Sequence, residues 1–151
     1  MKKIMILILF AGILFTASSQ QLQPGKANQA GSSNWDIVTG ITALHNGQII
    51  MTGAFYDSIS FSADTLISRG SRDVFIATCK ADGSFKEAIS FGGTGYEYVK
   101  KIEPLAEKGF LAPIQFNQTI EIEGQKFEGR CLNNILLAWF DNNMKLTSHA
   151  L

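Results

Sequence analysis

Short apolar segments separated by turn residues fill the chain after residue 33. Asn46-Gly47 and Asp82-Gly83 are pairs typical of β-hairpin turns. No segment of about ten residues follows the 3.6-residue period of an amphipathic helix. The pattern therefore predicts an all-β fold. Strands are expected over residues 37–44, 48–55, 58–61, 65–68, 73–80 and 85–91, and again over 110–116, 119–122 and 135–140.

The apolar positions recur after 61 residues, which predicts an internal repeat. Val38 corresponds to Val99 and Ile41 to Ile102. The correspondence continues through the later strands with one single-residue slip at a turn, where loops tolerate insertions. We expect two units of equal plan, at residues 30–90 and 91–151.

Two of the expected strands are apolar without alternation. The runs Ile-Ile-Met at 49–51 and Ile-Leu-Leu-Ala-Trp-Phe at 135–140 carry apolar side chains on both faces. An antiparallel strand with one wet face alternates instead. Strands buried on both faces are expected where sheets stack, as in a β-propeller. We therefore predict two consecutive four-stranded antiparallel propeller-like blades, an incomplete β-propeller, with a β-sandwich of the two sheets as the alternative.

Four stretches of the repeat carry a resemblance to a known family. These are Asn-Gly-Gln-Ile-Ile-Met-Thr-Gly at 46–53, Asp-Val-Phe-Ile-Ala at 73–77, Asp-Gly-Ser-Phe at 82–85 and Phe-Gly-Gly-Thr-Gly-Tyr-Glu-Tyr at 91–98. Together they resemble the SBBP-type β-propeller repeat over residues 31–151. The second unit departs from that pattern, because Ile114-Gln115 stands where Thr-Gly is expected and Pro113 interrupts the strand. The resemblance implies a propeller fold in an exported protein and brings no shared catalytic residues.

The first residues have the three parts of a secretory signal. Lys2 and Lys3 precede an apolar run at 4–15, and small residues follow at 16–19. The run is too short for a membrane span, which needs about twenty residues. We predict a signal peptide at 1–19 that is cleaved after Ser19, with Ala17 or Ser18 as alternatives. A flexible leader at 20–33 and a propeller-like domain at 34–151 should follow. The expected location is secreted, periplasmic or cell-surface, with no transmembrane segment in the mature chain.

The composition argues against one class of binding partner and against a disulfide-based fold. The chain has 151 residues, with 13 basic and 13 acidic side chains, so charge gives no case for nucleic-acid binding. Cys79 and Cys131 are too few for a disulfide scaffold. They could pair in an oxidising compartment. The alternative is that Cys79 is a small buried apolar side chain.

Few residues have the spacing of a chemical site. His45 and His149 lack a second ligand at metal spacing, so they are expected at the surface. Glu121 and Glu123 alternate, which fits either a glycosidase acid–base pair or the wet side of an edge strand, and we favour the latter. The loop Gly-Gly-Thr-Gly at 92–95 indicates a tight crossing between the units. Four aromatic residues near strand starts could line a carbohydrate-binding rim, although packing is the favoured interpretation: Trp35, Tyr56, Tyr96 and Tyr98.

The sequence thus favours an exported, non-catalytic β-repeat module with a binding or structural role. It predicts no catalytic residue, metal or cofactor, and leaves the ligand-binding residues undefined. Protein, glycan or further copies of the chain are the expected partners. The first alternative is a carbohydrate-binding envelope protein that forms an oligomeric propeller ring. The second is a fragment of a propeller glycosidase or lyase.

Overall fold

The computed structural model describes residues 28–62, 64–80, 82–106 and 108–151. This part of the chain is built from antiparallel strands and contains no helix, so the predicted all-β class is confirmed. None of its residues forms a helix of the length and apolarity that a membrane crossing requires. The predicted signal peptide at 1–19 and the leader up to residue 27 lie outside the described residues.

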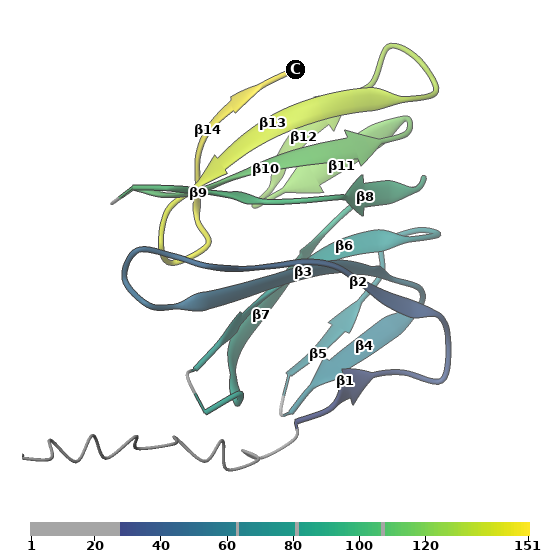
Figure 1. Cartoon of the computed structure of the whole chain (residues 1–151). Coiled ribbons are helices and arrows are strands. Elements are labelled where there is room, and N and C mark those ends of the chain that lie inside the picture. Colours follow the sequence, from purple (N-terminus) through teal and green to yellow (C-terminus); the bar gives the residue numbers. More distant parts are fainter. Residues whose placement is uncertain (1–27, 63, 81, 107) are drawn as a thin grey trace, which may run out of the picture.

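The first unit forms a four-stranded antiparallel sheet (Figure 1). Between its second and third strands the chain makes a small hairpin, whose apolar side packs on one face of the sheet. In spatial order the sheet contains β2 (Asp36–Ala43), β3 (Ile49–Phe55), β6 (Asp73–Cys79) and β7 (Phe85–Phe91), and the hairpin contains β4 (Ser58–Phe61) and β5 (Asp64–Ile67).

The second unit repeats this plan with its first strand broken into two pieces. Both pieces pair with the same neighbouring strand, so the sheet has four positions. The sheet contains β8 (Glu97–Val99) with β9 (Glu103–Leu105), then β10 (Gly109–Phe116), β13 (Asn134–Phe140) and β14 (Leu146–Ala150), and the hairpin contains β11 (Thr119–Ile122) and β12 (Gln125–Glu128).

Apart from the broken first strand, strand pairing in the second unit follows that of the first at an offset of 61 residues. Ile49 lies opposite Cys79, and their counterparts Phe110 and Phe140 lie opposite each other. The bulge at the end of β6 recurs at the end of β13. Left-handed backbone conformations also recur, at Asp57 and Gln118 and at Ser62 and Glu123. The repeat in the sequence therefore corresponds to a repeat in backbone geometry.

A short strand lies inside the segment predicted as a flexible leader. β1 (Ala30–Gly31) pairs with β4, where Gly31 lies opposite Ser60. Gly92 lies opposite Glu121 in the same way in the second unit. An edge strand such as β4 exposes unpaired backbone groups, and β1 satisfies part of them. Two residues are too few to produce a periodic pattern, so no local signal predicts this strand.

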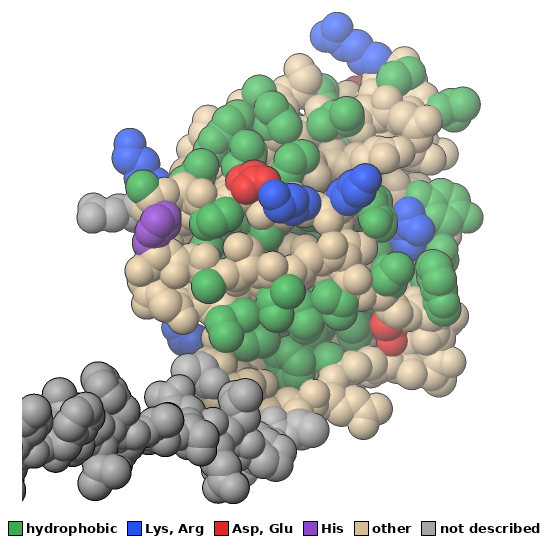
Figure 2. All heavy atoms as spheres, viewed as in Figure 1, with side chains coloured by type: hydrophobic (Ala, Val, Ile, Leu, Met, Phe, Trp, Pro, Cys, Tyr) green, Lys and Arg blue, Asp and Glu red, His purple; other side chains and the backbone are tan. Residues whose placement is uncertain are grey.

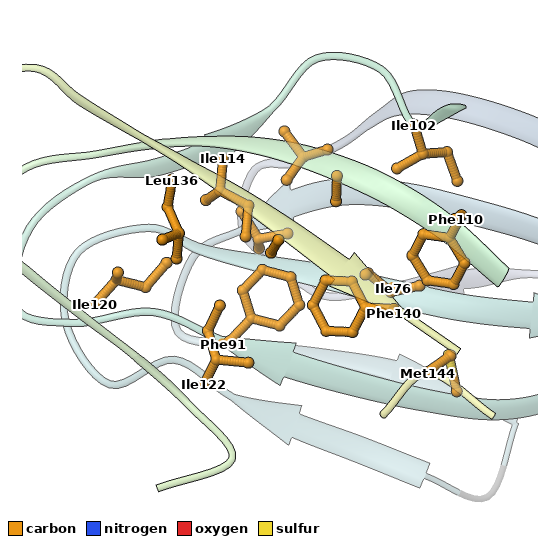
Figure 3. Close-up of a cluster of buried hydrophobic side chains, with 14 of the residues drawn as sticks. Ile76, Phe91, Ile102, Phe110, Ile114, Ile120, Ile122, Leu136, Phe140 and Met144 are labelled. Carbon is orange, nitrogen blue, oxygen red and sulfur yellow. The ribbon is translucent and has the colours of Figure 1, made fainter. Parts of the chain in front are cut away.

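The main hydrophobic core lies between the two units. Ile50, Val74 and Ile76 of the first sheet join a continuous cluster with buried residues of the second unit. Figure 3 shows the aromatic rings at its centre, where the Phe140 ring centroid lies 5.7 Å from that of Phe91 and 5.3 Å from that of Phe110. A smaller cluster fills the space between the first sheet and its own hairpin, and includes Phe55, Phe61 and Phe75.

The expectation that both units are buried on both faces is wrong for the second sheet. β6 is buried on both faces except at Cys79, because the β4–β5 hairpin covers one side and the second unit the other. In β13, Ile135 is 62% exposed and Leu137 and Trp139 are half-buried. The apolar run of β13 therefore has one packed face and one face that no described residue covers fully.

Phe140→Ala should destabilise the whole described fold. The ring lies at the centre of the shared core, and truncation of a buried phenylalanine leaves a cavity that costs about 3–5 kcal/mol. Urea unfolding followed by circular dichroism should show one transition shifted to lower urea. Phe85→Ala, at a half-buried position of the smaller cluster, is the control and should cost less. Equal losses would contradict the central role of the shared core.

Candidate functional site

A polar hollow of about 410 Å³ lies where the two units meet. We call it the junction groove. The first unit contributes one side chain from the residue before β6, and the second unit contributes the rest from the ends of β8, β10 and β13. The lining side chains are Arg72, Tyr96, Tyr98, Gln115, Asn117 and Asn133.

Arg72 is held against the second unit by its backbone. Its N–H donates to the carbonyl of Gly95 at 3.3 Å, and its carbonyl accepts from the N–H of Glu97 at 2.9 Å. The guanidinium carbon lies 5.7 Å from the ring centroid of Tyr96 and 5.5 Å from that of Tyr98. Cation–π attraction at these distances fixes the guanidinium against the two rings.

Amide side chains also line the groove. Gln115 Nε2 donates to Asn133 Oδ1 at 3.0 Å, which orients both amides. Asn117 directly follows the end of β10 and lines the groove as well. Arg72 is the one charged side chain among the described residues that line the groove. The groove therefore offers a positive charge, amide donors and acceptors, and aromatic rings.

Two fully buried carboxylates lie beside Arg72. Asp73 accepts from the hydroxyl of Ser68 at 3.0 Å and from the N–H of Arg69 at 3.1 Å. Glu97 Oε2 accepts from the N–H of Gly93 at 3.1 Å. Glu97 Oε1 is buried without a hydrogen-bond partner among the described residues. Burial of an unpartnered carboxylate oxygen is unfavourable for the ionised form.

The environment shifts the titration of both acids. Burial is the main cause that raises the pKa of Glu97 to about 7; the Gly93 N–H opposes the shift, the neighbouring Asp73 adds to it, and Arg72 opposes it. Burial also raises the pKa of Asp73, against the hydrogen bonds from Arg69 and Ser68. Near neutral pH, a substantial fraction of Glu97 is therefore protonated in the folded protein.

The glycine loop at 92–95 runs through a space too narrow for side chains, which confirms its interpretation as a tight crossing. A Cβ on Gly92 would lie 2.3 Å from the carboxyl carbon of Asp73, and one on Gly93 would lie 1.8 Å from the carbonyl oxygen of Thr119. A Cβ on Gly95 would lie 2.9 Å from the carbonyl oxygen of Asn117. Gly92 therefore permits close approach of the crossing to Asp73 of the first unit, and Gly93 and Gly95 permit its close approach to the second.

The structure divides the four aromatic candidates into two pairs. Tyr96 and Tyr98 line the groove, whereas Trp35 and Tyr56 lie outside it with their ring centroids 6.4 Å apart. Trp35 is 61% exposed and Tyr96 is 49% exposed. The favoured interpretation of these two residues as buried packing groups is therefore wrong. Each stands directly before the first strand of its unit, where the backbone turns at the surface.

The other candidate residues do not join the groove. Glu121 lies on the exposed side of β11, but Glu123 lies in the following turn at a φ of 50°, and its Oε1 accepts from the N–H of Leu146 at 3.2 Å. His45 and His149 are both exposed. In the described ranges, no three His, Cys, Asp or Glu side chains cluster as metal ligands would.

The two cysteines are free thiols in different units. Cys79 ends β6 and is partly buried, and burial raises the pKa of its thiol. Cys131 is exposed in the loop before β13, where its Sγ donates to the carbonyl of Asn133.

Four of the six groove residues were not predicted as site residues from the sequence: Arg72, Gln115, Asn117 and Asn133. One signal could have found two of them. Arg72 and Asn133 are counterparts in the repeat, and each stands directly before the acid or amide that begins the third strand of its sheet. Gln115 and Asn117 come beside Tyr98 and Asn133 through the pairing of β10 with β8 and β13, which joins residues far apart in the sequence.

Comparison with protein-family models, curated proteins and solved structures found no match.

Glu97 should make the protein less stable as the pH rises. The folded protein keeps the Glu97 proton up to about pH 7, whereas the carboxyl of an unfolded chain releases it near its usual 4.5. The folded state therefore binds more protons between these values, and its stability should fall through this window by roughly 3 kcal/mol. Asp73 contributes in the same direction.

Urea unfolding at pH 5 and pH 8 measures this effect. Glu97→Gln should remove most of the difference between the two pH values. Glu87→Gln neutralises an exposed carboxylate on β7 and is the control, which should retain the wild-type difference. An unchanged difference in Glu97→Gln would contradict the assignment.

Proposed function

We propose that this protein is an exported, non-catalytic binding module of two propeller-like blades, and that its junction groove binds a saccharide. One observation carries the proposal: the Arg72 guanidinium lies against the rings of Tyr96 and Tyr98, in a groove that the hydrogen-bonded amides of Gln115 and Asn133 also line.

The blade assignment is supported by the repeated sheets. Each unit has four strand positions joined in chain order, with the same hairpin inserted between the second and third. The sheets share a continuous apolar core, as neighbouring blades do. The resemblance to the SBBP-type repeat fits the same architecture.

The saccharide assignment is supported by the chemistry of the groove. Tyrosine rings provide apolar surface for the C–H faces of a sugar ring and a polar hydroxyl at their edge. Amide side chains both donate and accept, as sugar hydroxyls do. Arg72 adds a planar donor that suits a carboxylate, so acidic sugars such as uronic acids are favoured over neutral ones.

A non-catalytic role is supported by the absence of carboxylates from the described lining of the groove. Glycoside hydrolysis ordinarily needs two carboxyl groups on either side of the scissile bond. Glu121 and Glu123 lie elsewhere, and the latter is engaged with the backbone of β14. The glycosidase or lyase alternative therefore gains no support from this groove.

Tyr96→Ala should weaken saccharide binding at least tenfold. Isothermal titration with oligouronides and with neutral oligosaccharides of equal length measures this affinity. Trp35→Ala removes an aromatic ring of greater exposure outside the groove and should bind as the wild type does. Arg72→Gln should weaken the acidic ligands more than the neutral ones. No binding by the wild type, or equal loss in Tyr96→Ala and Trp35→Ala, would refute the groove as the site.

If the protein is exported, removal of the signal peptide should leave a defined new N-terminus. Production in a bacterial host with a secretion pathway should release a chain that begins at Gln20. Intact-mass measurement of the periplasmic and extracellular fractions tests this. A Ser19→Arg variant should block cleavage at that bond. Wild-type chain that retains Met1 and stays in the cytoplasm would contradict export.

A further inference from the structure

The molecule has two open apolar faces at opposite sides of its stacked sheets. The tail face is the uncovered side of the second sheet. The head face is the side of the first sheet that carries the β4–β5 hairpin. Figure 2 shows hydrophobic side chains gathered below β3, between β7 and this hairpin, where the head face meets solvent.

The tail face corresponds, through the 61-residue repeat, to a surface of the first sheet that is buried inside the molecule. It consists of Leu111, Pro113, Ile135, Leu137 and Trp139. Their counterparts 61 residues earlier all lie on the side of the first sheet that packs against the second unit, and all are buried: Ile50, Thr52, Val74, Ile76 and Thr78. Ile135, for example, is 62% exposed whereas Val74 is 0% exposed.

The head face repeats the other half of the same junction. It consists of Val38, Ile41, Ile49, Met51 and Cys79, of which Val38 is 55% and Ile41 70% exposed. Their counterparts in the second unit are fully buried in the shared core: Val99, Ile102, Phe110, Ala112 and Phe140. The two open faces are therefore related by the repeat to the two surfaces that already pack together within one chain.

The two residues of a polar contact across the junction also have counterparts beside the two open faces. Arg69 Nη1 donates to the carbonyl of Glu121 at 3.0 Å, from the first unit to the second. The counterpart of Arg69 is Arg130, which is exposed beside the tail face. The counterpart of Glu121 is Ser60 on the β4–β5 hairpin, at the head.

We propose that the tail face of one chain binds the head face of a second copy, through a contact that repeats the internal junction. The contact joins different surfaces of the two copies, so it is heterologous and leaves one free head and one free tail. Further copies add until the ring closes or a filament forms. Large open apolar faces are unusual on a monomer, and this arrangement covers both of them.

Two lysine substitutions separate this arrangement from other forms of association. Ile135→Lys blocks the tail and Ile41→Lys blocks the head, and both side chains are already exposed, so the monomer should keep its fold and thermal midpoint. Ile67→Lys is the control. Ile67 is 71% exposed, and its counterpart Glu128 stays exposed in the second unit, so the position lies outside the repeated contact.

Light scattering after size exclusion should show that the exported wild type and Ile67→Lys assemble with rising concentration. Ile135→Lys and Ile41→Lys should each remain monomeric under the same conditions. An equimolar mixture of these two variants should give a dimer and nothing larger, because one intact head then meets one intact tail. A monomeric wild type overturns the proposal. Assembly that Ile135→Lys abolishes and Ile41→Lys leaves intact also overturns it, because the contact would then join two tails.

Discussion

The packing of Phe110 and Phe140 of the second unit against Phe91 of the first is the interaction on which the rest of the structure depends. A sheet with two apolar faces needs two covers. At β6 the first sheet obtains one from its own hairpin and the other from the second unit, while Val38 and Ile41 of β2 stay exposed on the hairpin side. Neither unit could bury the same surface alone, which is the general condition of repeat architectures.

The close approach of the two units restricts the residues that border their shared core. The crossing at 92–95 consists largely of glycine because the backbone of β11 and the carboxylate of Asp73 occupy the space that side chains would need. Glu97 lies two residues after this crossing and is fully buried, and one of its oxygens has no described partner. The junction thus combines apolar packing, which stabilises the fold, with a buried acid whose ionisation destabilises the fold as the pH rises.

The same approach creates the groove. Arg72 belongs to the first unit, yet the rings beside it and the backbone groups that hold it belong to the second. A ligand in the groove would contact both units, so its binding would favour the packed junction over the separated sheets. The proposed assembly would extend the same stacking in both directions from these two units.

The sequence by itself determined the longer strands and the order of the repeat, whereas the short strands β1, β8, β9 and β12 and the final strand β14 had no clear signal. Hairpin turn pairs and apolar runs are local signals, so the expected strands at 58–61, 85–91 and 119–122 match the observed ones. The 61-residue offset of the sequence reappears when the pairing of β3 with β6 is compared with that of β10 with β13. Only the tertiary structure decided which face of each sheet is covered. The run at 135–140 is apolar throughout, so its pattern could not show that Leu136 is buried while Ile135 faces solvent. Contact between Arg72 and Tyr98, and the burial of Glu97, likewise depend on how two distant sheets pack, which no local pattern records.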